Sequence, residues 1–187
     1  MYLLSSILIS SILIIILKPL LSKFVKDIPN RRSSHKSEVP RAGGLIFVIP
    51  ILGYSFFSGN FVFLSLLPLV LISFLDDLFN ISRILRLLIQ IITILLIIFL
   101  FENPLIFLIN SNLLFLLSVI FAGLVVINIF NFMDGMDGLI AGCSLIIISR
   151  SIFLYSSEFS ILIGSLIVFL FYNWSPAKIF MGDIGST

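Results

Sequence analysis

Five aspartates are the residues of this chain best suited to chemistry, and they lie in three short polar segments. They are Asp76, Asp77, Asp134, Asp137 and Asp183. The chain holds a single cysteine and a single histidine, which excludes a disulfide framework and a Cys/His zinc site built within it. Clustered carboxylates without such partners favour Mg²⁺ or Mn²⁺, and nearby Lys and Arg suit a phosphorylated substrate. The residue types therefore predict a metal-dependent phosphoryl site.

The longest polar pattern places Asn128, Asn131, Asp134 and Asp137 three residues apart. On a straight α-helix each such step drifts by about 60°, so neighbours in the series touch while its ends diverge. The glycines that follow both aspartates allow the backbone to break or to approach a ligand closely. The pattern predicts that these amides and carboxylates surround one ligand, with a helix cap and a hydrophilic turn as the alternative.

The other two acidic segments follow apolar runs directly. Asp76 and Asp77 come after Leu66 to Leu75, and two adjacent carboxylates about 4 Å apart repel by about 4 kcal/mol at an effective dielectric near 20. A cation, a proton or exposure to water would relieve that repulsion. Asp183 lies between two glycines, in a turn that can offer N–H groups and a carboxylate to a metal-bound phosphate, or that is a plain turn.

A basic loop at residues 22–41 carries six Lys and Arg residues between Lys23 and Arg41. Such a loop usually sets membrane topology and contacts anionic lipids. Its last residues, Pro40-Arg-Ala-Gly-Gly44, have a constrained backbone that suggests the wall of a site. We expect His35 to be a polar loop residue and not a metal ligand.

The elements that must position these residues are membrane-spanning helices. The chain of 187 residues is 60% hydrophobic and 11% charged, with a mean hydropathy of +1.28, which indicates an integral membrane protein. We predict an all-α, polytopic transmembrane bundle of about seven spans, with the first helix retained. Crossing the bilayer takes about 20 helical residues, so a turn must divide residues 45 to 75 at Ser58-Gly59-Asn60. The predicted segments are 2–21, 42–57, 61–75, 84–101, 113–130, 139–155 and 159–174.

The positive-inside rule fixes the orientation of this bundle. With the N-terminus outside, ten of the eleven Lys and Arg residues lie on the cytoplasmic side, and Arg150 is the exception. The same count of crossings puts all five aspartates on the cytoplasmic face. The sequence therefore predicts one site at the inner membrane surface.

Four motifs in order resemble the polyprenyl-phosphate N-acetylhexosamine-1-phosphate transferases. The motifs are Asn30-Arg-Arg-Ser-Ser-His35 with Pro40 to Gly44, Asp76-Asp77, Asn128 to Gly138, and Phe180-Met-Gly-Asp-Ile-Gly-Ser186. The resemblance implies one integral-membrane transferase domain over 1–187 in the bacterial inner (plasma) membrane. It implies transfer of a sugar 1-phosphate from a UDP-sugar to undecaprenyl phosphate with Mg²⁺ (or Mn²⁺), releasing UMP in one step or two. The first loop looks more like the branch that initiates cell-surface glycans such as O-antigen or teichoic acid.

The resemblance also implies roles for single residues. Asp183 matches the magnesium ligand, and Asp76 and Asp77 match the pair that positions or deprotonates the lipid phosphate. Asp134 and Asp137 fall where the family contacts the nucleotide-sugar and its phosphates, which completes the expected catalytic set. The expected substrate-binding residues are Asn128, Asn131, Arg41, Lys36, and the uracil-contacting pair Asn173 and Phe180.

The resemblance is incomplete, because the family continues past the last motif with further helices and a His-containing loop. We therefore expect a domain lacking its C-terminal part, and a truncated, inactive membrane remnant is the alternative. A transporter is disfavoured because the aspartates lie at span ends and not at mid-membrane. A CDP-alcohol phosphotransferase is disfavoured because Leu139-Ile-Ala-Gly142 lacks its Ala-Arg signature. We expect membrane lipids and no nucleic acid as partners, with a homodimer left open.

Overall fold

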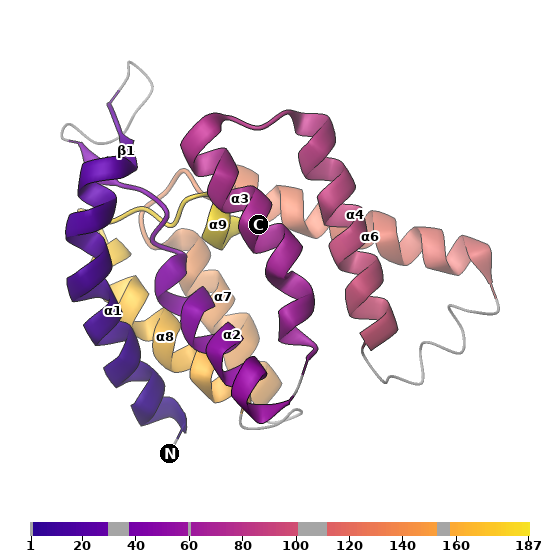
Figure 1. The fold of residues 1–187 in the computed structure, drawn as a ribbon, viewed down its shortest axis with the longest axis horizontal. Helices are drawn as coiled ribbons and strands as arrows, with labels where there is room; N and C mark the ends of the chain where they lie inside the picture. Colours follow the sequence, from indigo (N-terminus) through magenta and orange to yellow (C-terminus); the bar gives the residue numbers. More distant parts are fainter. Residues whose placement is uncertain (1, 30–37, 60, 101–111, 153–157) are drawn as a thin grey trace.

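A computed structural model describes residues 2–29, 38–59, 61–100, 112–152 and 158–187 of the chain (Figure 1). The regular secondary structure of the described chain is helical apart from two short strands, β1 and β2, which pair antiparallel. These strands are β1 (Lys26–Asp27) and β2 (Val39–Pro40). The helices are α1 (Tyr2–Phe24), α2 (Leu45–Ser58), the 3₁₀ turn η1 (Phe63–Leu66), α3 (Leu67–Phe79), α4 (Arg83–Leu100), α6 (Leu113–Met133), α7 (Leu139–Ile152), α8 (Glu158–Asn173) and α9 (Asp183–Ser186).

The predicted all-α membrane fold is confirmed. Three helices of the described chain, α1, α4 and α6, are long and apolar enough to cross a membrane by length and composition. The apolar helices α2, α7 and α8 are shorter, and α3 is shorter still. Each of the seven predicted hydrophobic segments contains a helix, while the number of complete crossings stays a prediction.

The predicted break between the second and third segments is also confirmed. Helix α2 ends at Ser58, and Gly59 follows it in the left-handed conformation with φ of 73°. Glycine adopts this conformation without a Cβ clash, so it is a common helix terminator. Asn60, the last residue of the predicted turn, lies outside the described residues.

The core lies where α1, α2 and α8 pack together, on the left in Figure 1. Its largest fully buried side chain is Phe169 of α8, whose ring meets Phe47 of α2 edge-on at 5.6 Å between centroids. Polar and small residues bring the helices close. Ser10 of α1 donates a hydrogen bond to the carbonyl oxygen of Ile46 at 3.1 Å. Such small and hydroxyl side chains are typical of helix contacts inside a membrane.

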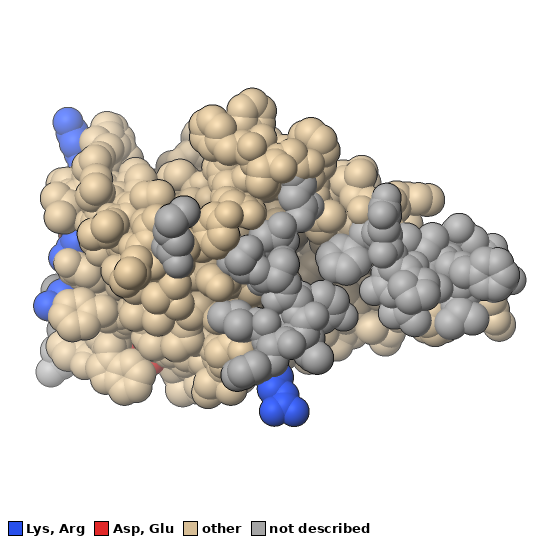
Figure 2. Space-filling view, turned by 90° about the horizontal axis from the view of Figure 1, so that it is seen from below, with Lys and Arg blue, Asp and Glu red and all other residues tan. Residues whose placement is uncertain are grey.

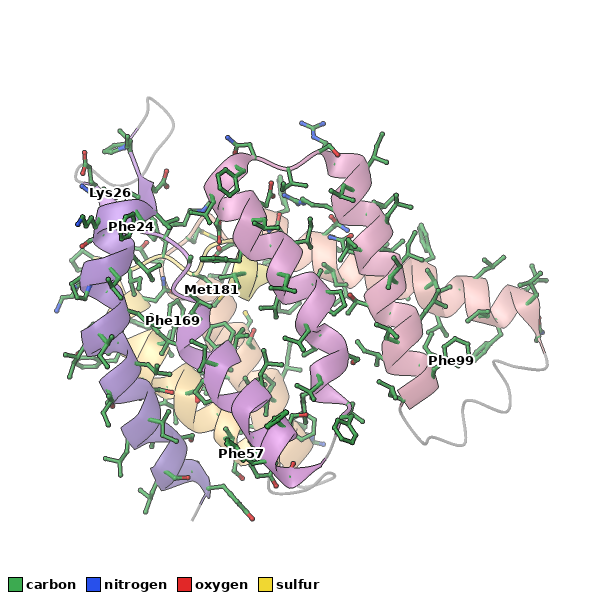
Figure 3. The ribbon with its side chains drawn as sticks, in the orientation of Figure 1. Phe24, Lys26, Phe57, Phe99, Phe169 and Met181 are labelled. Atoms are coloured by element: carbon green, nitrogen blue, oxygen red, sulfur yellow. The ribbon has the colours of Figure 1, made fainter. Side chains whose placement is uncertain are left out.

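Large apolar side chains cover the outside of the bundle, as lipid contact requires. Figure 3 labels Phe24, Phe57 and Phe99, which are 69%, 88% and 73% exposed, at the periphery. Phe169 and Met181, labelled in the interior, are 0% and 1% exposed. Figure 2 views the molecule from the end where α1 begins and α2 ends, and few charged side chains appear among the described residues of that face. Most ion pairs of the described residues lie instead around α9, where Arg41 and Arg86 meet aspartates.

Candidate active site

Two loops that are distant in sequence are joined by backbone hydrogen bonds. The amides of Gly43 and Gly44 donate to the carbonyl oxygens of Phe180 and Met181, both at 2.9 Å. This clasp between the end of the basic loop and the last polar segment places Arg41 beside the acidic residues. The joined residues are 137 positions apart in the sequence (Gly43 to Phe180), and the clasp brings the two motifs to one centre.

The clasp depends on glycine because two backbones touch within it. A Cβ on Gly44 would lie 2.5 Å from Cα of Gly185, which is closer than side-chain carbons approach backbone atoms. We predict that Gly44→Ala forces the loops apart and lowers any activity of this site at least about tenfold. Gly53→Ala is the matched control, since a Cβ on Gly53 of α2 meets nothing within 4 Å. Equal activity of the two variants would contradict the clasp.

Asp77 holds the start of α9 in place. Its carboxylate oxygens accept hydrogen bonds from the backbone N–H groups of Asp183, at 3.0 Å, and Ile184, at 3.3 Å. The Nε of Arg41 lies 3.0 Å from the same carboxylate, whose side chain is fully buried. Charge-assisted bonds of this kind are the strong ones. In this geometry the Asp77 carboxylate positions Asp183.

Asp183 is the centre of the polar cluster. Its carboxylate accepts a hydrogen bond from the Asn131 amide at 2.9 Å, and it lies 3.2 Å from Nη2 of Arg41 and 3.4 Å from Nη1 of Arg86. Burial raises the pKa of Asp183, and a hydrogen bond with the Asp76 carboxyl acts in the same direction. These groups come from α6, from the residue after β2 and from α4, and they converge on α9.

Asp76 is tied to the same centre through Arg86. The Arg86 guanidinium donates to the Asp76 carboxylate and to the Asn131 side-chain oxygen, the latter at 3.4 Å. The other Asp76 oxygen accepts a hydrogen bond from the backbone N–H of Ile81. Arg86 therefore links α3, α4, α6 and α9, and the adjacent carboxylates of Asp76 and Asp77 are separated by their different partners.

Asp134 caps the C-terminal end of α6 at the edge of this cluster. Burial raises the pKa of its carboxyl to about 7; the charge of Arg41 opposes this, while Asp183 and Asp77 add to it. These interactions place Asp134 within electrostatic reach of the centre. A cation bound there would stabilise the ionised form of Asp134.

Asp137 and Asn173 fasten two turns to each other. The Asp137 carboxylate accepts a hydrogen bond from the backbone N–H of Ala177 at 3.0 Å. The Asn173 side chain accepts from the N–H of Gly138 at 3.0 Å and donates to the carbonyl oxygen of Ile179 at 2.9 Å. Asn173 is buried. Both residues thus shape the loop that leads to α9, and their predicted ligand contacts stay predictions.

The remaining predicted residues occupy different surroundings. The Asn128 amide donates to Gln90 at 2.9 Å and to the carbonyl oxygen of Leu124, one turn back on α6. Phe180 is half-buried, and its backbone belongs to the clasp. Lys36 lies outside the described residues, together with the rest of 30–37.

The sequence of residues 60–187 matches a known family model, that of glycosyl transferase family 4. The chain belongs to glycosyl transferase family 4. The matched region contains four of the elements that meet at Asp183, namely α3, α4, α6 and α9.

Curated relatives of this family 4 chain carry two kinds of name. A phospho-N-acetylmuramoyl-pentapeptide-transferase of Dictyoglomus turgidum is 34% identical, over 82% of the chain and 58% of the relative. An undecaprenyl-phosphate alpha-N-acetylglucosaminyl 1-phosphate transferase of Thermotoga maritima is 35% identical, over 91% of the chain and 57% of the relative. A probable undecaprenyl-phosphate N-acetylglucosaminyl 1-phosphate transferase of Bacillus subtilis is 30% identical, over 95% and 57%. The chain therefore spans somewhat more than half the length of these relatives.

The donor set of the family 4 site suits a hard cation held by few protein ligands. Among the described residues, no three carboxylate, thiol or imidazole groups are gathered closely enough to enclose a metal by themselves. Mg²⁺ is commonly held by one or two carboxylates together with waters and substrate phosphates. Asp183, with Asp134 close enough to interact electrostatically, fits a site in which one or two carboxylates hold the ion.

Sequence reasoning missed the central place of Arg86. The signal for it is weak: an Arg83-x-x-Arg86 pair opens α4, and Arg83 lies six residues after Asp77. Only the fold shows that Arg86 turns toward the carboxylates while Arg83 is exposed. Ser186, which accepts a hydrogen bond from the Asn131 amide at 3.0 Å, and Gln90 were missed for the same reason.

Proposed function

We propose that this chain transfers an N-acetylhexosamine 1-phosphate, or a related sugar 1-phosphate, from a UDP-sugar to undecaprenyl phosphate. UMP is released, and the lipid product starts a cell-surface glycan. The names of the relatives in both branches support the reaction class. The observation that carries the proposal is the convergence of Asp76, Asp77 and Asp183 with Arg41 and Arg86.

The two arginines fit the charge of the donor. The pyrophosphate of a UDP-sugar is anionic, and a planar guanidinium can bind a phosphate through two parallel hydrogen bonds. Arg41 is partly exposed, with 38% of its side chain accessible, so it can reach a ligand while its Nε stays beside Asp77. In the reaction a lipid phosphate oxygen attacks the phosphorus that carries the sugar, and the bond between the two donor phosphates breaks.

Asp183 is the residue proposed to hold Mg²⁺, or Mn²⁺ in its place. When bound, the ion would neutralise charge on the donor phosphates and on the departing UMP. Asp77 keeps the Asp183 backbone in position through two N–H contacts, and Asn131 orients its carboxylate. Arg86 holds the Asp76 carboxylate in place. The negative charge of that carboxylate would attract a proton of the incoming lipid phosphate.

An apolar cavity beside the cluster supports a lipid acceptor. It measures about 170 Å³ and is lined by residues of α2, η1, α3 and α8. Ile184 and Thr187 form its border on the side of Asp183. The isoprenoid units next to the lipid phosphate could pack against the apolar wall of this cavity, while the phosphate lies near the charged centre.

The site is proposed to face the cytoplasm in the bacterial inner membrane. UDP-sugars are made in the cytoplasm, and the distribution of Lys and Arg residues favours this orientation. The charged contacts described above lie at the ends of α3, α4 and α6, which supports a site at the depth where a lipid phosphate meets water.

Release of UMP tests the proposal. Membranes containing the chain and undecaprenyl phosphate should release UMP from UDP-N-acetylglucosamine in the presence of Mg²⁺. EDTA should abolish the release, and added Mg²⁺ or Mn²⁺ should restore it. UDP-N-acetylmuramoyl-pentapeptide is the competing donor, and we expect it to react at least about tenfold more slowly. Release no greater than in membranes lacking the chain, with both donors, would overturn the proposal.

A further inference from the structure

Apolar burial does not hold α6 in its place. None of its described residues is buried, although its sequence is the most apolar of the long helices. Lipid tails are as apolar as leucine, so helices inside a membrane associate through close packing and polar contacts and not through the hydrophobic effect. Yet α6 delivers Asn131 and Asp134 to the candidate site. Something else must set its position.

The contacts between α4 and α6 are few and specific. In Figure 1, α6 crosses behind α4, and the two helices touch. Gly123 of α6 allows close approach, since a Cβ there would lie 2.9 Å from a methyl carbon of Ile94. The Asn128 amide donates to the side-chain oxygen of Gln90 at 2.9 Å. Gln90 is 2% exposed, so this hydrogen bond is shielded from competing water.

Gln90 lies on the same face of α4 as Arg86. The two residues are four apart, which makes them neighbours on one side of a helix. Their partners on α6, Asn128 and Asn131, are three apart and form a matching pair. Gln90 thus lies about 6 Å farther from the charged centre along α4 than Arg86.

We propose that Gln90 is a positioning residue: its hydrogen bond to Asn128 fixes α6 against α4, so that Asn131 reaches Asp183. The consequence for catalysis rests on the proposed function. Gln90 contacts neither the UDP-sugar nor the lipid phosphate, and it acts through Asn131. Asn128 accordingly serves the α4–α6 contact in addition to its predicted place near the substrate.

Thr93 provides a matched control one turn farther along α4. Its side chain is fully buried, and its hydroxyl has no hydrogen-bond partner within the described part of the chain. Thr93→Val keeps the shape and removes only that hydroxyl. Because no bond is lost, this variant should leave α6 and its contacts unchanged.

Cross-linking measures the position of α6 without reference to activity. The side chains of Asn131 and Ser186 touch at 3.0 Å, so Asn131→Cys with Ser186→Cys, in a Cys143→Ser chain, should react quickly with a short bifunctional thiol reagent. Adding Gln90→Met, which keeps length but loses the hydrogen bond, should slow cross-linking about threefold to tenfold, the range expected for one interhelical hydrogen bond. Adding Thr93→Val should not slow it.

Kinetics distinguish positioning from general instability. In the chain that keeps Asn131, Gln90→Met should lower kcat about threefold to tenfold and leave KM for the UDP-sugar within about twofold. In the cross-linking chain, the exchanged pair Gln90→Asn with Asn128→Gln offers the same two groups in reverse order and should recover most of the lost cross-linking rate. Failure of that exchange to recover the rate, with normal thermal stability, would contradict the positioning role.

The two proposals fail in different ways. If Gln90→Met cross-links at the parent rate, Gln90 does not position α6, whatever the activity. If cross-linking slows but no chain releases UMP, the proposed function is wrong and the placement of Gln90 stands.

Discussion

Replacing Asp183 by Asn should reduce UMP release by at least about 10³-fold. The substitution keeps the size and the hydrogen-bonding shape of the side chain but removes the charge at the centre of the cluster. Arg41 and Arg86 would keep Asp77 and Asp76 as partners, so the fold should survive. The loss falls on transition-state stabilisation, where one electrostatic contact is worth about 10²–10³ and a metal ion several kcal/mol more.

A surface carboxylate provides the control for that substitution. Glu38 pairs with Lys26 at 2.8 Å, and more than half of its side chain is exposed. Exposed pairs contribute at most about 1 kcal/mol, so Glu38→Gln should leave UMP release within about twofold. Thermal unfolding in detergent should show both variants folded. An Asp183→Asn chain that keeps more than a tenth of parental activity would contradict the central place of Asp183.

Replacing Arg86 by Met should lower UMP release about 10²-fold and should also destabilise the chain. Arg86 is the contact that joins Asp76 to Asp183 and Asn131. Without it, the buried Asp76 carboxylate keeps the backbone N–H of Ile81 and the Asp183 carboxyl as described partners, and neither carries a positive charge. Breaking a buried ion pair by removing one partner costs about 3–5 kcal/mol, because the other charge stays buried.

Arg83 tests whether that effect belongs to the site. It lies one turn earlier on the same helix, and it is exposed. Arg83→Met removes an identical charge and should change UMP release less than about twofold, apart from any effect on topology. Arg86→Lys should fall between parent and Arg86→Met, because an ammonium keeps the charge but cannot contact Asp76, Asp183 and Asn131 together. Similar losses of UMP release for Arg83→Met and Arg86→Met would show that the loss comes from removing a positive charge in general and not from the contacts of Arg86.

The positions of the helices could be predicted because short stretches of the sequence determine both the apolar runs and the breaks between them. Each predicted segment contains a helix; the length of residues 45–75 required a break, and the turn residues Ser58-Gly59-Asn60 placed it. The meeting of Asp76, Asp77 and Asp183 followed from counting crossings, which needs no contact information. The structure brings these three carboxylates into one hydrogen-bonded cluster.

The partners of those carboxylates could not be predicted, because they depend on long-range geometry. Nothing in the sequence distinguishes Arg86 from Arg83, and the approach of Gly44 to Gly185 joins residues more than 140 positions apart. Asp77 was expected to act on the lipid phosphate, yet its carboxylate accepts hydrogen bonds from two backbone N–H groups of α9. Asp137 was grouped with the site by regular spacing, but the turn after α6 directs it to Ala177.

Labelling from the two sides of the membrane tests most directly whether the acidic segments share one face. In a Cys143→Ser chain, single substitutions Phe79→Cys, Met136→Cys and Lys178→Cys each report on one segment from an exposed position. All three should react with an impermeant maleimide only in inside-out vesicles, whereas Phe57→Cys should react only in right-side-out vesicles. Reaction of any one of the first three from the face that labels Phe57→Cys would contradict a single cytoplasmic site.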